Sequence, residues 1–120
     1  MNATFLRQFN YENPPCTQLR RSANVQSMYD QFSKTSGPKA FIEGVKQRIK
    51  KEKYILLENM FPYDVEPPIQ HKCLWYEDNL SREEVQAIID QQNMECITFF
   101  ENPDNLKSIK DVKHYHIFHY

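Results

Sequence analysis

The spacing of hydrophobic residues along the chain predicts three helices. Apolar side chains recur every three to four positions in three stretches, which gives each stretch one face to bury. The last stretch has the clearest start, because Ser81 and Glu84 form a capping box while Leu80 and Val85 form a hydrophobic staple. The predicted helices span residues 22–33, 38–51 and 81–93.

Four shorter stretches have the composition of strands, being rich in β-branched, aromatic and aliphatic residues. They span residues 54–58, 69–76, 96–101 and 112–119. Helices and strands do not alternate strictly along the chain, so the order predicts an α+β fold rather than a doubly wound one. We expect a mostly antiparallel four-stranded sheet with the helices packed on one face.

The N-terminal segment has no clear periodicity. Phe5 and Phe9 are apolar, and a Pro-Pro pair further along interrupts regular structure. We therefore divide the chain into an N-terminal arm, residues 1–19, and a single α+β domain, residues 20–120, whose length suits one modest core. Such an arm can fold back over the domain or reach for a protein partner.

Composition narrows the classes of partner. The net charge is −1 and only two glycines are present. The charge gives no reason to expect nucleic acid or an anionic membrane surface, and the scarcity of glycine disfavours a loop that cradles phosphate. No apolar run reaches the length of a membrane span and no leader-like apolar segment opens the chain, so we expect no membrane association.

The end of the second predicted helix is basic. This end carries Lys46, Arg48, Lys50, Lys51 and Lys53. It is either a phosphate-binding patch or a solvated face whose cations suit the helix C-terminus. The absence of interleaved aromatic residues, on which bases could stack, favours the solvated face.

Three histidines fall close together near the C-terminus, among aromatic and β-branched residues. Because alternate side chains of a strand share a face, His114 and His116 point the same way, and the neighbouring His119 points the other way. A histidine-triad hydrolase needs a third histidine on that shared face, and Phe118 occupies the position, so that mechanism is disfavoured. His71 and Trp75 likewise share one face of their own predicted strand.

An ordered set of short motifs between residues 54 and 118 carries a family resemblance. The set comprises the Pro62-Tyr63 turn, Ile69-Gln70-His71 in a strand that ends at Trp75, Asn102, Leu106-Lys107-Ser108 and the closing His114-Tyr115-His116. In this order and spacing the chain resembles the DUF3605 family, whose fungal members include the N-acetylglucosamine-induced proteins. The resemblance supports the fold and a shared candidate site. It implies no particular activity.

The candidate ligand-binding residues are His71, Trp75, Asn102, Ser108, His114 and His116. Imidazole serves equally as a metal ligand, a proton carrier or a hydrogen-bonded core group. Three alternatives therefore stay open: histidines that are only structural, a pocket for a small phosphorylated sugar or nucleotide, and a divalent metal held by His71, His114 and His116. No other cofactor is indicated.

Two function classes follow. In the first, the chain is a small-molecule domain whose histidines line a pocket. In the second, it is a non-enzymatic interaction or assembly protein that uses residues 1–19 and exposed aromatic side chains. No supported catalytic constellation decides whether the protein is an enzyme.

The cysteines yield a prediction. Cys16, Cys73 and Cys96 are odd in number and form no C-x-x-C pair, which indicates a reducing compartment, and we expect the cytoplasm. Mass spectrometry of the unreduced protein is expected to show three free thiols. A Cys73–Cys96 bond would contradict this expectation.

Overall fold

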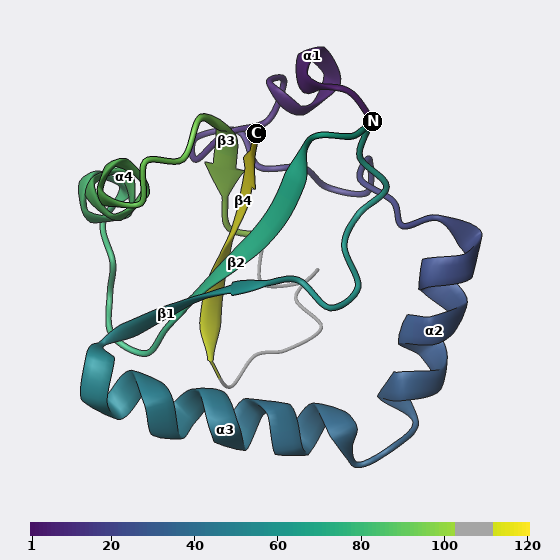
Figure 1. Cartoon of the computed structure of the whole chain (residues 1–120), viewed down its shortest axis with the longest axis vertical. Helices are drawn as coiled ribbons and strands as arrows, with labels where there is room; N and C mark the ends of the chain where they lie inside the picture. The colour runs from purple at the N-terminus through teal and green to yellow at the C-terminus, as the bar shows by residue number, and fades with distance from the viewer. Residues whose placement is uncertain (103–111) are drawn as a thin grey trace.

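The computed structural model describes residues 1–102 and 112–120 and consists of a four-stranded sheet surrounded by helices (Figure 1). The helices are α1 (Ala3–Leu6), α2 (Ala23–Ser33), α3 (Gly37–Glu52) and α4 (Arg82–Gln91). The strands are β1 (Tyr54–Glu58), β2 (Gln70–Tyr76), β3 (Cys96–Phe100) and β4 (Lys113–His119). The predicted α+β fold is confirmed; the short helix α1 was not predicted.

The sheet has the strand order β1-β2-β4-β3, and every neighbouring pair is antiparallel. The predicted antiparallel sheet is therefore confirmed. Strands β2 and β4, the two central ones, come from segments about forty residues apart in the chain. Their pairing places His71 opposite Phe118, Cys73 opposite His116, and Trp75 opposite His114.

Helices cover both faces of the sheet, which differs from the expectation of one covered face. Cys73 and Trp75 pack with Ile42 and Val45 of α3, and we call this side of the sheet the histidine face. The intervening Leu74 packs with α4 on the opposite side, which we call the α4 face. Period-two alternation along β2 gives apolar residues to both sides, so both sides need a cover.

The ends of the helices follow their capping signals. The Ser22 hydroxyl accepts a hydrogen bond from the backbone N–H of Val25 at the start of α2. The predicted capping box of Ser81 and Glu84 is present at the start of α4. Helix α3 ends at Lys53, whose φ of 70° lies in the left-handed region and turns the chain directly into β1.

The N-terminal arm folds back onto the domain. Leu6 and Phe9 are buried against Phe100 and Phe118. The hydroxyl of Thr98 donates to the carbonyl oxygen of Phe9 at 2.5 Å. The N-terminal ammonium group donates to the backbone carbonyl of Asp64 at 2.6 Å. Two apolar side chains of the arm, Leu6 and Phe9, are thus buried within the chain, whereas Tyr11 is exposed.

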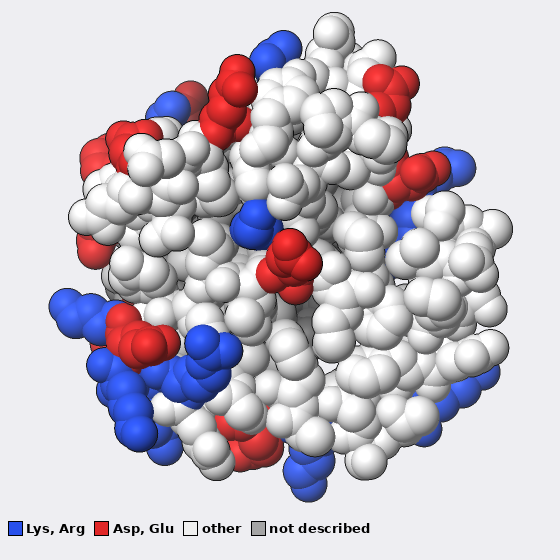
Figure 2. All heavy atoms as spheres, viewed as in Figure 1, with Lys and Arg blue, Asp and Glu red and all other residues white. Residues whose placement is uncertain are grey.

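Many charged side chains lie toward the edge of the view in Figure 2 and others lie near its centre, and basic ones gather over the C-terminal end of α3. Lys50 and Lys51 occupy the last turn of this helix, where cations oppose the negative end of its dipole. Within the described part of the chain, no helix is long and apolar enough to cross a membrane.

The cysteines lie apart. Cys73 is buried on the histidine face, whereas Cys96 packs with the residues of the α4 face and Cys16 is exposed in the arm. All three are free. The sheet itself separates Cys73 from Cys96, so a disulfide between them would require the sheet to rearrange.

The packing of the arm makes a stability prediction. Leu6 is fully buried, and its replacement by Ala removes apolar contacts and leaves a cavity, at a cost of about 2–5 kcal/mol in the free energy of unfolding. Gln8→Ala, at an exposed position two residues away, is the control and is expected to cost no more than about 0.5 kcal/mol. Urea denaturation measures both. Equal stability of Leu6→Ala and the unsubstituted protein would mean that the arm does not contribute to the folded core.

Candidate functional site

The candidate site is built on the two central strands. The antiparallel register of β2 and β4 brings His71, His114 and His116 to the histidine face, with Trp75 directly opposite His114. All four side chains are buried. The structure therefore brings together the three histidines and the tryptophan that the sequence singles out. The fourth histidine, His119, lies on the α4 face, where Lys72 Nζ is 2.7 Å from its Nε2.

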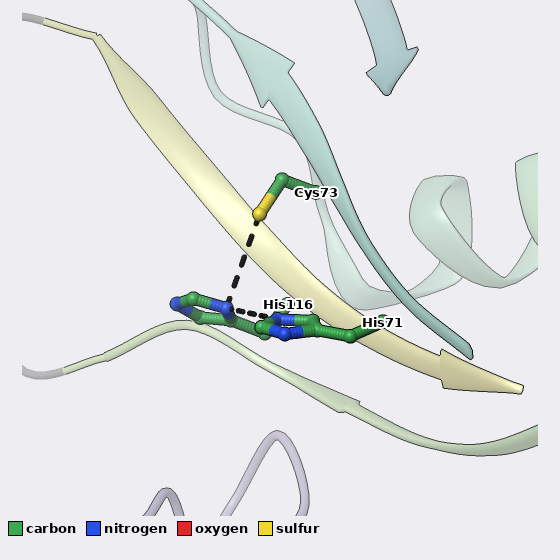
Figure 3. A group of neighbouring side chains, drawn as sticks. All are labelled: His71, Cys73 and His116. Atoms are coloured by element: carbon green, nitrogen blue, oxygen red, sulfur yellow. Dashed lines mark hydrogen bonds between the residues drawn. The ribbon is translucent and has the colours of Figure 1, made fainter. Parts of the chain in front are cut away.

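His71 and His116 form the centre of the site. Nε2 of His71 lies 2.8 Å from Nδ1 of His116, a hydrogen bond between two buried rings (Figure 3). The sulfur of Cys73 points toward the same edge of His116, at 4.0 Å from its Nδ1. On the far side of His71, the backbone N–H of Tyr63 donates to Nδ1 at 3.1 Å. On the far side of His116, the side-chain amide of Asn102 lies 3.2 Å from Nε2.

Aromatic rings enclose these histidines. The ring of His71 stacks against both Tyr63 and Phe118, with ring centroids 5.0 and 4.4 Å away. Trp75 stacks on His114 with centroids 4.3 Å apart, and the ring of His114 meets that of His116 edge-on at 4.9 Å. The rings of His71 and His116 are thereby fixed in orientation by packing as well as by hydrogen bonds.

Burial keeps the central histidines neutral. Loss of hydration, followed by the positive charge of Arg21 and the neighbouring His114, lowers the pKa of His71 to about 3. The pKa of His116 is lowered well below its usual value, mainly by burial and then by His114, His71 and Arg21. Neither ring carries a charge near neutral pH, so both act there through N–H groups and lone pairs.

A cavity of about 330 Å³ opens between this face of the sheet and helices α2 and α3. Its floor includes His114, His116 and Trp75, and its walls are largely aromatic. Polar groups on its lining come from Arg21, Asn59, Asn102 and Glu58. His71 does not line it but lines a second, more open hollow, which shares Tyr63 and Asn59 with the first. The aromatic wall residues are Tyr29, Phe32, Phe41, Phe61 and Tyr63.

Arg21 supplies the positive charge of this cavity. Its guanidinium carbon lies 4.2 Å from the centroid of the Tyr29 ring and 5.2 Å from that of Tyr63. Its Nε–H donates to the backbone carbonyl of Phe61 at 2.7 Å. Two ring faces and one carbonyl hold the planar group in place. The bond to the Phe61 carbonyl uses one of its five N–H groups, and the other four can donate to further acceptors.

The cluster does not fit a metal ion in its present arrangement. His71, Cys73 and His116 offer ligand atoms that all lie within 4.8 Å of one another. However, nitrogen ligands on a tetrahedral zinc stand about 3.3 Å apart, whereas these two nitrogens share a hydrogen bond at 2.8 Å. A metal-bound histidine also donates its second N–H to an acceptor, yet Nδ1 of His71 faces a donor, the Tyr63 N–H. Burial further raises the pKa of the Cys73 thiol to about 12, which disfavours the thiolate.

Sequence reasoning named most of the central residues and missed others. The side chain of Asn102 lies beside His116, and Ser108 lies outside the described residues. Cys73 was not named, although parity with His71 along β2 places it on the same face. Arg21 was also missed, because no sequence signal links a residue before α2 to a strand fifty positions later.

The comparisons with known proteins bear on the fold. No family model matches the chain, and no curated protein matches it. The crystal structure of HTC1 resembles it with a TM-score of 0.61 at 16% sequence identity, covering 87% of this chain and 77% of that one. At this identity the likeness shows a shared fold alone. The resemblance to the DUF3605 family stays a prediction.

The neutral histidines predict a pH dependence of stability. In the unfolded chain His71 gains a proton as the pH falls below 6.5, whereas in the folded protein its pKa is about 3. The unfolded state therefore binds more protons in this window, and stability is present above pH 6.5 and lost as the pH falls toward 3. Each such histidine contributes a slope of up to about 1.4 kcal/mol per pH unit.

Urea unfolding between pH 5 and 7.5, approximately the window in which only histidines titrate, measures this slope. We expect His71→Gln to reduce this slope by the contribution of roughly one bound proton, which is about 1.4 kcal/mol per pH unit, relative to the unsubstituted protein. The matching comparison above pH 7.5 is the control, since histidine is neutral there in both states. Parallel pH profiles for the two proteins would show that His71 is not held neutral by the fold.

Proposed function

We propose that this chain is a small-ligand-binding domain whose cavity takes a small phosphorylated sugar or nucleotide. The observation that carries the proposal is the cavity between α2, α3 and the histidine face, with one arginine on a mostly aromatic lining. Concave sites with apolar walls and a few placed polar groups are the usual form of small-molecule sites.

The charges of the lining favour an anionic group on the ligand. Arg21 is the one Lys or Arg among the described residues around the cavity, and it is oriented by Tyr29, Tyr63 and the Phe61 carbonyl. A guanidinium binds phosphate oxygens in pairs through its fixed fork of donors. Glu58 also lines the cavity and offers an acceptor for ligand hydroxyl groups.

The aromatic walls favour a ligand with a flat or apolar ring face. Trp75 is already stacked on His114, while Phe41 meets it edge-on with centroids 5.4 Å apart. A volume of about 330 Å³ lies at the lower end of the range for ligand pockets, which suits one sugar phosphate or mononucleotide.

The alternative is an interaction or assembly protein. The arm, residues 1–19, has less apolar surface available to a partner than its sequence predicts, because Leu6 and Phe9 are buried within the same chain. This packing favours the ligand-binding proposal. The free cysteines fit a reducing compartment, and a cytoplasmic location is part of our proposal.

Binding is tested by NMR titration with glucose 6-phosphate and adenosine 5′-monophosphate, each compared with its uncharged counterpart, glucose or adenosine. We expect at least one phosphorylated compound to bind more tightly than its counterpart and to shift resonances of residues that line the cavity. Arg21→Met is expected to weaken this binding about tenfold or more, the equivalent of 1.4 kcal/mol.

Arg20→Met is the matched control, because it removes the same charge from the adjacent, exposed position. Its binding should equal that of the unsubstituted protein, and the spectra of both variants verify the fold. An equal loss of binding in Arg21→Met and Arg20→Met would mean that only the net charge of the protein matters, and not the position of Arg21. Failure of all four compounds to bind would favour the interaction protein instead.

A further inference from the structure

The hydrogen bonds through the two central histidines run in one direction. The chain begins at a backbone N–H, that of Tyr63, which can only donate. Nδ1 of His71 therefore acts as the acceptor, and a neutral ring that accepts at Nδ1 carries its hydrogen at Nε2. His71 must then donate from Nε2 to Nδ1 of His116, 2.8 Å away.

The same logic fixes His116. Its Nδ1 accepts from His71, so its single hydrogen lies on Nε2 and points to the side-chain amide of Asn102, 3.2 Å away. The oxygen and nitrogen of an amide have nearly the same size, so the partner decides which of them faces it. In the structure the amide nitrogen of Asn102 is the atom nearer to this ring, but an N–H donor from His116 requires the amide oxygen in that place.

From this series of hydrogen bonds we infer that Asn102 presents its NH2 group to the cavity and selects ligands that place a hydrogen-bond acceptor there. The acceptor is a carbonyl, carboxylate or phosphate oxygen. The inference rests on the proposed function in so far as it needs a ligand in the cavity, which Asn102 lines. Its first step, the orientation of the amide, needs no ligand.

The opposite orientation leaves a conflict inside the protein. If Asn102 donated to Nε2 of His116, the hydrogen of His116 would lie on Nδ1 and point to His71. His71 would then have to accept at Nε2 and carry its own hydrogen on Nδ1, directly against the Tyr63 N–H, 3.1 Å from that nitrogen. Two donors would face each other in a buried place, which proteins avoid.

Asn59 shows the contrast within the same cavity. Its oxygen accepts from the backbone N–H of Phe61 at 2.8 Å, and its nitrogen donates to the sulfur of Cys73 at 3.5 Å. Both ends of that amide already have partners in the protein. Its replacement by Asp keeps the acceptor for Phe61 and adds one negative charge to the cavity lining.

The orientation is tested without a ligand by two-bond 1H–15N correlation spectra of the histidine rings near pH 7.5. Resonances are assigned with single His→Gln variants. We expect both His71 and His116 to show a protonated Nε2 and an unprotonated Nδ1. A protonated Nδ1 on either ring overturns the inference, whatever binds in the cavity.

The selective role is tested by titrating Asn102→Asp and Asn59→Asp with glucose 6-phosphate and adenosine 5′-monophosphate. Aspartate at position 102 still accepts from His116 but has no NH2 group. We expect Asn102→Asp to weaken binding at least tenfold more than Asn59→Asp, which controls for the added charge. Equal weakening overturns the selective role.

The two proposals can fail separately. If neither compound binds the unsubstituted protein, the proposed function fails and the selective role fails with it, while the ring spectra still decide the orientation of the amide. If binding occurs and the two Asp variants behave alike, the cavity is a ligand site in which Asn102 does not choose the ligand.

Discussion

The register between β2 and β4 is the constraint on which the rest of this structure depends. It sets Cys73 against His116 and Trp75 against His114, and places His71 close enough to bond to His116. A slip of one residue would turn every side chain of one strand to the opposite face. The histidines would then be divided between the two sides of the sheet, and His71 and His116 could not meet.

The two sides of the sheet have become different environments. The α4 face is an apolar core in which Leu74 and Ile117 are fully buried. The histidine face buries imidazoles instead, and a buried polar group is stable only when it is hydrogen-bonded. Partners for His71 and His116 come from outside the two strands, from the Tyr63 backbone and the Asn102 side chain. The segments that supply these partners also border the cavity, so the same residues provide hydrogen bonds to His71 and His116 and form part of the cavity wall.

Local signals in the sequence were enough for the elements other than α1 and for much of the candidate site. Period-two parity placed His114 and His116 together, and the capping box at Ser81 marked the start of α4. The sequence did not indicate which side α4 would cover, because β2 supplies apolar residues to both sides. Arg21 and Tyr63 reach the site only through the path of the chain in space, to which no periodicity refers. The family resemblance named the turn at Tyr63 but gave it no role.

In the proposed ligand site, the neutral state of the histidines determines what kind of recognition is possible. A pair of charged imidazoles beside Arg21 would attract any anion, and their attraction would change steeply near neutral pH. Burial removes that charge, as the lowered pKa values of His71 and His116 show. Attraction of an anion is then left to Arg21. The two rings continue a series of hydrogen bonds that begins at the Tyr63 N–H, in which each ring accepts at Nδ1 and donates from Nε2. Charge and hydrogen-bond polarity are thus supplied by separate groups, so a ligand must satisfy both to bind well.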